Sequence, residues 1–198
     1  MLKVLLKFIA LIGILFLAPL ILAAIIFVFL EDGSPVLFIQ KRIGKNEKNF
    51  NLFKIRTMYK DTPSLGTHEV GKDQCLKSGK FLRDLKIDEL PQVLNFLFGH
   101  IDLVGPRPGL TNQNELLEFR RKHNVFKVKP GITGLGQILG FDMSNPELLA
   151  KIDSLYISNK SIKLDFKILL ATFLKSYRIK IFDDFKEDIK LIKENINV

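Results

Sequence analysis

Two neighbouring carboxylates, Asp88 and Glu89, stand directly before an apolar stretch with helical spacing, and they are suited to phosphoryl chemistry. The exposed N–H groups and the positive dipole end at the start of a helix favour carboxylate and phosphate groups alike. A carboxylate pair there can hold Mg²⁺, which prefers oxygen ligands and shares them with substrate phosphates. One carboxylate can also attack phosphorus. The alternative, a helix cap followed by a first-turn acid, is the commoner arrangement of such residues.

Basic residues elsewhere have the properties of phosphate ligands. Arg107 lies between two prolines in Gly105-Pro106-Arg107-Pro108-Gly109, and both prolines restrict the backbone around it. A guanidinium held in this way suits bidentate phosphate binding, although a rigid turn with a surface arginine is the simpler interpretation. Lys54 and Arg56 add positive charge at the end of a predicted strand. The glycine-rich run at 131–136 can wrap a phosphate in backbone N–H groups, but it lacks the P-loop and dinucleotide patterns.

An uncharged stretch of 23 residues at 8–30 precedes these groups and is long enough to span a bilayer as a helix. It is too long for a signal peptide and lacks a clear cleavage site, so we expect it to stay in the mature protein. Pro19, near its middle, removes a backbone donor and clashes with the preceding turn. Each 11-residue half is about 16 Å of helix. A kinked single span and a re-entrant hairpin both fit these lengths, and basic residues beyond both ends do not decide between them.

The remaining sequence predicts short strands and helices. Apolar spacing before Gly99 indicates a helix for which Asp88 is the N-cap. A basic amphipathic helix near the C-terminus is of the kind that lies on an anionic membrane, although packing against the domain's own core explains it equally well. The expected elements are strands at 36–40, 50–58 and 125–128, the first two paired as a hairpin, a mobile loop at 59–79, and helices at 90–98, 146–156 and 164–176.

Composition narrows the class of protein. The 198 residues include 30 Lys and Arg against 21 Asp and Glu, a formal net charge of +9, which favours phosphates, nucleic acid or an acidic membrane as partners. The apolar fraction of 47% argues against a disordered chain, and one cysteine excludes an intramolecular disulfide. A membrane segment, a basic domain, a carboxylate pair and candidate phosphate ligands together indicate phosphoryl chemistry on a lipid-borne substrate.

Four motifs in one chain resemble the monotopic phosphoglycosyl transferases of the bacterial sugar transferase family, in their small form. The resemblance extends from about Lys3 to Arg178. It implies an α+β fold with a re-entrant membrane helix-hairpin over 1–31, broken at Pro19. A small mixed catalytic domain over 32–198 follows, with short strands and interfacial amphipathic C-terminal helices. The four motifs are Phe53-Lys54-Ile55-Arg56-Thr57-Met58, Lys86-Ile87-Asp88-Glu89-Leu90-Pro91-Gln92, Asp102-Leu103-Val104-Gly105-Pro106-Arg107-Pro108 and Pro130-Gly131-Ile132-Thr133-Gly134.

The resemblance also implies an activity: transfer of a sugar-1-phosphate from a UDP-sugar to undecaprenyl phosphate, with release of UMP and with Mg²⁺ as cofactor. Asp88 matches the family's nucleophile, which forms a phosphosugar intermediate in a ping-pong route. Glu89 completes the acidic dyad, either by helping the lipid phosphate to attack or by sharing the metal with Asp88. Arg107 matches the family's phosphate-binding arginine. Further basic positions around the site correspond to Lys54, Arg56 and Arg83.

Location and partners are implied in the same way. The resemblance places the protein in the bacterial inner (cytoplasmic) membrane as a monotopic protein, with both hairpin ends and the catalytic domain on the cytoplasmic face. Its implied partners are the UDP-sugar donor, the undecaprenyl phosphate acceptor and membrane lipid, with no nucleic acid. The reaction would be the first membrane step of glycoconjugate assembly. The motifs specify neither the sugar, nor the glycan pathway, nor the oligomeric state.

One departure from the family pattern follows the glycine-rich turn. Members often have Gln-Val-Asn-Gly-Arg, whereas this chain has Gln137-Ile138-Leu139-Gly140-Phe141, and the absent arginine puts any contact at that position in doubt. Two other classes fit the residues. One is a membrane-tethered hydrolase of nucleotide sugars or lipid pyrophosphates that uses water as acceptor. The other is a basic membrane-anchored module that binds nucleic acid or anionic lipid.

Overall fold

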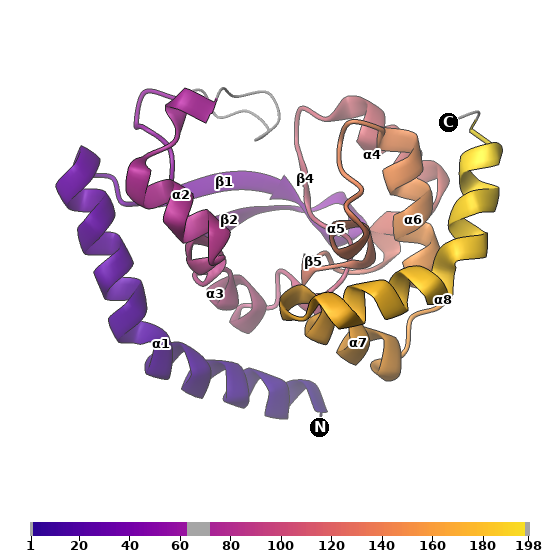
Figure 1. Ribbon diagram of the computed structural model, residues 1–198, viewed down its shortest axis with the longest axis horizontal. Helices are drawn as coiled ribbons and strands as arrows, with labels where there is room; N and C mark the ends of the chain where they lie inside the picture. The colour runs from indigo at the N-terminus through magenta and orange to yellow at the C-terminus, as the bar shows by residue number, and fades with distance from the viewer. Residues whose placement is uncertain (1, 63–71, 197–198) are drawn as a thin grey trace. The chain divides into compact units, whose positions relative to one another are not determined.

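The computed structural model describes residues 2–62 and 72–196, which form short strands and helices after one long apolar helix (Figure 1). This confirms the α+β class. The chain divides into two compact units, one of Met1–Lys41 and Asn51–Gly99, the other of Arg42–Phe50 and His100–Val198. The predicted division into a membrane segment at 1–31 and a catalytic domain at 32–198 concerns the position of the membrane and stays a prediction.

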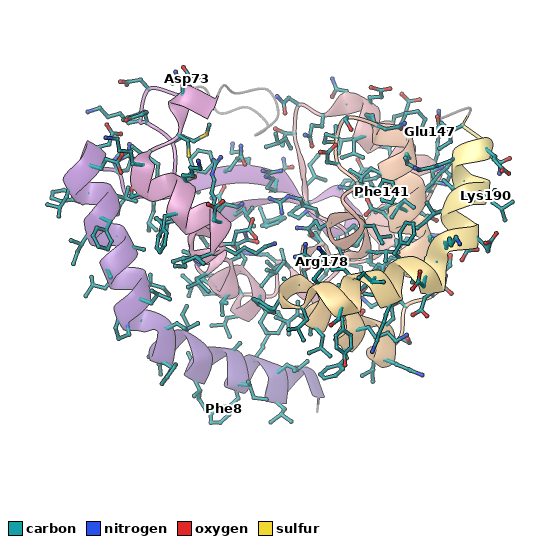
Figure 2. All side chains as sticks on the ribbon, viewed as in Figure 1. Phe8, Asp73, Phe141, Glu147, Arg178 and Lys190 are labelled. Carbon is teal, nitrogen blue, oxygen red and sulfur yellow. The ribbon has the colours of Figure 1, made fainter. Side chains whose placement is uncertain are left out.

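Helix α1 (Leu2–Asp32) continues through Pro19 and bends partway along its length (Figure 1). Pro19 therefore does not interrupt the helix, because neighbouring hydrogen bonds hold the backbone on both sides of the missing donor, and a proline inside a helix is a usual cause of such a bend. Val4–Asp32 is long and apolar enough to cross a membrane, and the protein buries 11% of its most apolar window. Phe8, for example, projects from the outer face of α1 and is 60% exposed (Figure 2). The re-entrant arrangement stays a prediction.

The later elements of the first unit pack on the other face of α1. Ala24 and Val28, one helical turn apart, are buried against apolar side chains of the strand and helices that follow. Those side chains are Ile55, Leu76, Leu82 and Ile87. The later helical elements of this unit are η2 (Lys72–Gln74), α2 (Lys77–Asp84), η3 (Ile87–Glu89) and α3 (Gln92–Leu97).

Part of the predicted mobile loop at 59–79 is wrong, since α2 begins at Lys77 and η2 precedes it. The part at 63–71 lies outside the described residues. Helix α2 packs so closely on Thr57 that a Cβ at Gly79 would lie 2.2 Å from the Thr57 carbonyl oxygen. Gly79 favoured a loop in the sequence analysis, but tertiary packing against Thr57 requires glycine at this position.

The described part of the chain forms two small sheets. Strands β1 (Leu37–Ile43) and β2 (Asn49–Ile55) confirm the predicted hairpin strands and contribute residues to both units. They form a sheet with β4 (Gly109–Leu110) in the order β2-β1-β4, and β1 pairs antiparallel with β4 through Arg42 and Leu110. Strands β3 (Asp102–Val104) and β5 (Gly131–Thr133) pair in parallel.

Helices form the core of the second unit. Ile152, Ile168 and Ile181 are completely buried in one apolar cluster that also contains Val104. Side chains of Asn145 and Ser161 cap α6 and α7 by accepting from the N–H groups of Leu148 and Leu164. The helical elements of this unit are η1 (Lys45–Glu47), α4 (Asn114–Lys122), η4 (Val125–Lys127), α5 (Leu135–Leu139), α6 (Pro146–Ser158), α7 (Ile162–Phe173) and α8 (Lys175–Glu194).

Two expectations for the second unit are wrong in detail. The strand expected at 125–128 is the 3₁₀ turn η4, preceded by left-handed Asn124 (φ 56°), which turns the chain out of an extended path. The helix expected at 164–176 ends at Phe173, and Leu174 (φ −113°, ψ 112°) separates it from α8. The apolar pattern continues across this break because both helices face the same core. The helix expected at 146–156 is confirmed as α6.

Candidate active site

Asp88 and Glu89 lie in the short turn η3 between α2 and α3. Lys86 leads into the turn in the left-handed conformation (φ 58°, ψ 22°). Helix α3 begins only at Gln92, after Pro91. The expectation that Asp88 caps the following helix is therefore wrong: Pro91 has no N–H group to continue a hydrogen-bonded ladder from η3 into α3.

The two acids have different surroundings. Asp88 is only 6% exposed. Glu89 accepts from the Lys54 ammonium at 2.7 Å, and both side chains of this pair are largely buried. Burial of carboxylates is costly, and such costs are concentrated at functional sites. A buried aspartate beside a buried ion pair is therefore the candidate reactive group of the first unit.

The other predicted basic residues of this unit have separate places. Arg83 Nε donates to Thr57 Oγ1 at 2.7 Å, which ties α2 to the end of β2. Arg56 is buried and donates to the Asp32 carboxylate and to the Gly33 carbonyl oxygen, the latter at 2.7 Å. The structure thus brings Lys54 to the acids and Arg56 to the end of α1. A role for Arg56 in phosphate binding stays a prediction.

Arg107 is exposed on a turn of the second unit, whereas all the other residues from 104 to 110 are buried. The glycine-rich motif supports this turn: Gly131 N–H donates to the Pro106 carbonyl at 3.0 Å. A Cβ at Gly131 would lie 2.1 Å from the Gly105 nitrogen, and one at Gly134 would lie 2.2 Å from the Gly105 carbonyl oxygen. These glycines are needed for backbone contact, and the Gly131 N–H group is used within the protein instead of being presented to a phosphate.

Two further arginines support the Arg107 turn, and the sequence analysis missed both in this role. Arg42 Nη1 donates to the Pro108 carbonyl at 2.9 Å. Arg120, completely enclosed, donates to Asp153 from Nε and Nη2 at 3.0 and 2.6 Å. Arg120 and Pro108 line the same small hollow. The pairing of Arg120 with Asp153 spans 33 residues, so no local pattern in the sequence predicts it. The presence of an arginine within a helix that also has apolar residues is only a weak indication.

Burial in the core shifts the pKa of two side chains of the second unit, Asp153 and Tyr156. Burial raises the pKa of the Asp153 carboxyl, while the charge and hydrogen bonds of Arg120 oppose the shift. Burial, together with a hydrogen bond to Asp165, raises the pKa of the Tyr156 hydroxyl. Tyr156 also lies 3.2 Å from the Val104 carbonyl, just before the Arg107 turn. Asp153 and Tyr156 thus connect α6 to α4, to α7 and to the strand before the Arg107 turn.

Phe141 occupies the position at which the family pattern often has arginine. Its ring packs against the core between α4 and α6 (Figure 2). The Lys193 ammonium of α8 lies 5.8 Å from the ring centroid. This position therefore serves packing in this chain and offers no guanidinium to a ligand.

The oxygen donors of Asp88 and Glu89 suit Mg²⁺, which is commonly held by one or two carboxylates with substrate phosphates and water completing its shell. Among residues 2–62 and 72–196, no group of three or more His, Cys, Asp or Glu side chains is placed to hold a metal ion. Asp88 and Glu89 could supply one or two of the ligands of Mg²⁺, and substrate phosphate and water would have to supply the others.

Comparison with known proteins agrees with these features. The chain matches the family model described as bacterial sugar transferase over residues 1–178. It is 43% identical over 157 residues to the uncharacterized sugar transferase EpsL of Bacillus subtilis, covering 78% of this chain and 76% of that protein.

Two further relatives have more specific names. The chain is 37% identical to a UDP-glucose:undecaprenyl-phosphate glucose-1-phosphate transferase of Caulobacter vibrioides, covering 78% of this chain and 61% of that protein. It is 34% identical to a UDP-N-acetylgalactosamine-undecaprenyl-phosphate N-acetylgalactosaminephosphotransferase of Aeromonas hydrophila, covering 82% and 40%. The chain thus spans less than two thirds of the length of these two relatives.

Proposed function

The chain belongs to the bacterial sugar transferase family, and from this we propose that it transfers a sugar-1-phosphate from a UDP-sugar to undecaprenyl phosphate and releases UMP. The names of the Caulobacter and Aeromonas relatives support this substrate class. The structural observation that carries the proposal is the burial of Asp88 beside the Lys54–Glu89 ion pair. That environment suits a carboxylate that reacts rather than one that is merely solvated.

The proposed chemistry has two steps on one aspartate. A carboxylate oxygen of Asp88 attacks the phosphorus that bears the sugar, and the bond from this phosphorus to the bridging oxygen breaks, so that UMP leaves with that oxygen. An oxygen of undecaprenyl phosphate then attacks the same phosphorus. The bond to Asp88 breaks, the carboxylate is restored, and the lipid carries a diphosphate-linked sugar. Covalent catalysis of this kind lets two bulky substrates use one reacting group in turn.

The neighbouring residues have proposed roles that follow from their charge. Lys54 holds Glu89 in place, and the Glu89 carboxylate stays beside Asp88 to orient the second attack. Arg107, exposed on a rigid turn, binds a donor phosphate, and Arg83 adds positive charge close to the acids in sequence. Mg²⁺, held by Asp88 and Glu89, would offset negative charge on the pyrophosphate and on departing UMP.

The long apolar helix supports a membrane location for this reaction. We propose that α1 is embedded in the cytoplasmic membrane as a re-entrant element, with the catalytic residues on the cytoplasmic face. An acceptor phosphate could then reach Asp88 while its polyprenyl chain stays in the bilayer. The product would begin assembly of a surface polysaccharide or another glycoconjugate.

A panel of radiolabelled UDP-sugars, each given to the enzyme with and without undecaprenyl phosphate, tests the proposal. The expected result is labelled lipid that forms only when the acceptor is present, with one UMP for each sugar transferred. Free sugar phosphate that accumulates regardless of lipid would instead identify a hydrolase. Retention of labelled donor without any product would indicate a binding module.

A further inference from the structure

The two limbs of the bent helix α1 contact opposite ends of the segment that carries the acids. At the C-terminal limb, the Glu31 carboxylate accepts from the backbone N–H groups of Lys77 and Ser78 at 2.7 and 2.9 Å. These are the first two residues of α2, whose own N-cap, Leu76, offers no side-chain hydrogen bond. Glu31 therefore caps α2 from another helix, with a negative charge at the positive dipole end.

The N-terminal limb makes the complementary contact. Lys7 Nζ donates to the Leu97 carbonyl oxygen at 2.6 Å. Leu97 is the last residue of α3, where carbonyl groups lack helical partners and a positive charge is favoured. The ammonium of Lys7, on an apolar helix, is thus satisfied by the end of a helix that follows Asp88 and Glu89.

The bend in α1 allows both contacts to be made by one helix (Figure 1). In a straight helix, Lys7 and Glu31 would be about 36 Å apart along the axis, at 1.5 Å per residue. Bending shortens this separation. Between the two contacts lie Arg83, Asp88 and Glu89, so the segment 77–97 is held at its start by one limb and at its end by the other.

We propose that Lys7 and Glu31 are positioning residues and that α1 acts as a clamp that fixes the placement of Asp88. The bend then serves the chemistry in addition to membrane insertion. This inference rests on the proposed role of Asp88. It predicts that loss of either contact loosens the segment 77–97 and slows attack by Asp88, while donor binding through other residues changes little.

The test uses full-length enzyme in nanodiscs of phosphatidylethanolamine and phosphatidylglycerol. Lys7→Met, Glu31→Gln and the double variant are compared with Lys7→Arg, which keeps the charge, and with Glu187→Gln, an exposed acid of α8. Two quantities are measured: amide hydrogen exchange over 77–97, and the single-turnover rate of UMP release from UDP-sugar without lipid. The KM for the donor is measured in parallel.

We expect faster exchange near Lys77 in Glu31→Gln and near Leu97 in Lys7→Met. The single-turnover rate should fall about tenfold in each, with the donor KM within about twofold of wild type. Lys7→Arg should retain the wild-type rate. The double variant should lose less than the product of the single losses, because both contacts hold one segment.

Unchanged exchange in both single variants would overturn the clamp. Faster exchange with an unchanged rate would overturn the positioning role and leave only a structural contact. If wild-type enzyme releases no UMP without lipid, the covalent route of the proposed function fails. The exchange data would still report on the clamp in that case, so the two failures are distinguishable.

Discussion

Lys54 and Glu89 meet at 2.7 Å in an ion pair whose side chains are only 15% and 17% exposed. Lys54 is on β2 and Glu89 is in η3, so the pair joins the hairpin to the turn that carries Asp88. Pairs this far from solvent are costly to break, because the remaining charge keeps its desolvation penalty. The pair therefore determines where the carboxylate next to Asp88 can be.

Replacement of Asp88 by asparagine should abolish turnover. The amide is nearly isosteric but cannot form an acyl phosphate, so overall transfer should fall by at least about a thousandfold while the fold is retained. Sugar transfer to lipid and circular dichroism measure the two effects. Asp183→Asn, at an exposed position of α8, is the control. Substantial transfer by Asp88→Asn would contradict the assignment of the nucleophile.

Replacement of Lys54 by methionine should leave the Glu89 carboxylate largely buried without its cation. We expect a loss of about 2 kcal/mol in the free energy of unfolding and a strong fall in kcat. Combining Lys54→Met with Glu89→Gln should recover stability but not activity. Urea unfolding measures the stability of each variant, and UMP release measures its activity. A double variant as unstable as the single one would show that the pair does not account for the effect.

Replacement of Gly131 by alanine should disturb the turn that carries Arg107. The added Cβ would lie 2.1 Å from the Gly105 nitrogen, so the backbone has to move. We expect a destabilisation of about 3 kcal/mol and a rise of about tenfold in the donor KM. Gly13→Ala, where no atom lies within 4 Å of the new methyl group, is the matched control. Equal behaviour of the two variants would argue against the proposed support.

Replacement of Arg120 by leucine should make stability depend on pH. Burial raises the pKa of Asp153, and removal of Arg120 takes away the interaction that opposes the shift. A folded-state pKa above the unfolded value means that stability is greatest below the unfolded value and is lost as pH rises through the folded one. We therefore expect a deficit of about 3 to 5 kcal/mol at neutral pH that shrinks as pH falls.

Thermal unfolding of this variant at about pH 7.5 and about pH 5 checks the direction of the effect. Arg121→Leu is the control: Arg121 pairs with Glu47 at the surface, and both side chains are exposed. An exposed pair of this kind contributes roughly 0 to 1 kcal/mol. A deficit for Arg120→Leu that grows towards acidic pH would contradict this account.

Local patterns predicted the elements whose cause is local. The hairpin strands β1 and β2 and helix α6 follow from alternating or helical spacing of apolar residues. Helix α2 was missed because its eight residues contain Gly79 and its N-terminus is capped by Glu31, 46 positions earlier. No local pattern contains such a partner. The three-residue strands β3 and β5 are too short to show any period.

The residues of the candidate site also separate into those that local patterns indicate and those whose contacts depend on distant parts of the chain. Residue types and motifs selected Asp88, Glu89 and Arg107, since unusual chemistry in a rigid context is visible in a sequence. The resemblance placed Lys54 and Arg56 around the site, but no local pattern predicted their partners: Lys54 pairs with Glu89 across 35 residues, and Arg56 joins the end of α1 across 24. The sequence offered phosphate wrapping as one use of the glycine-rich run, whereas in the structure its glycines permit close backbone contact with Gly105.

Helix α8 continues well past residue 178, where the match to the family ends. Three of its side chains beyond that point, Ile181, Phe185 and Ile189, are almost inaccessible to water. A chain shortened to residues 1–178 would expose the apolar side chains of α6 and α7 that these three residues cover, and it would be prone to aggregate.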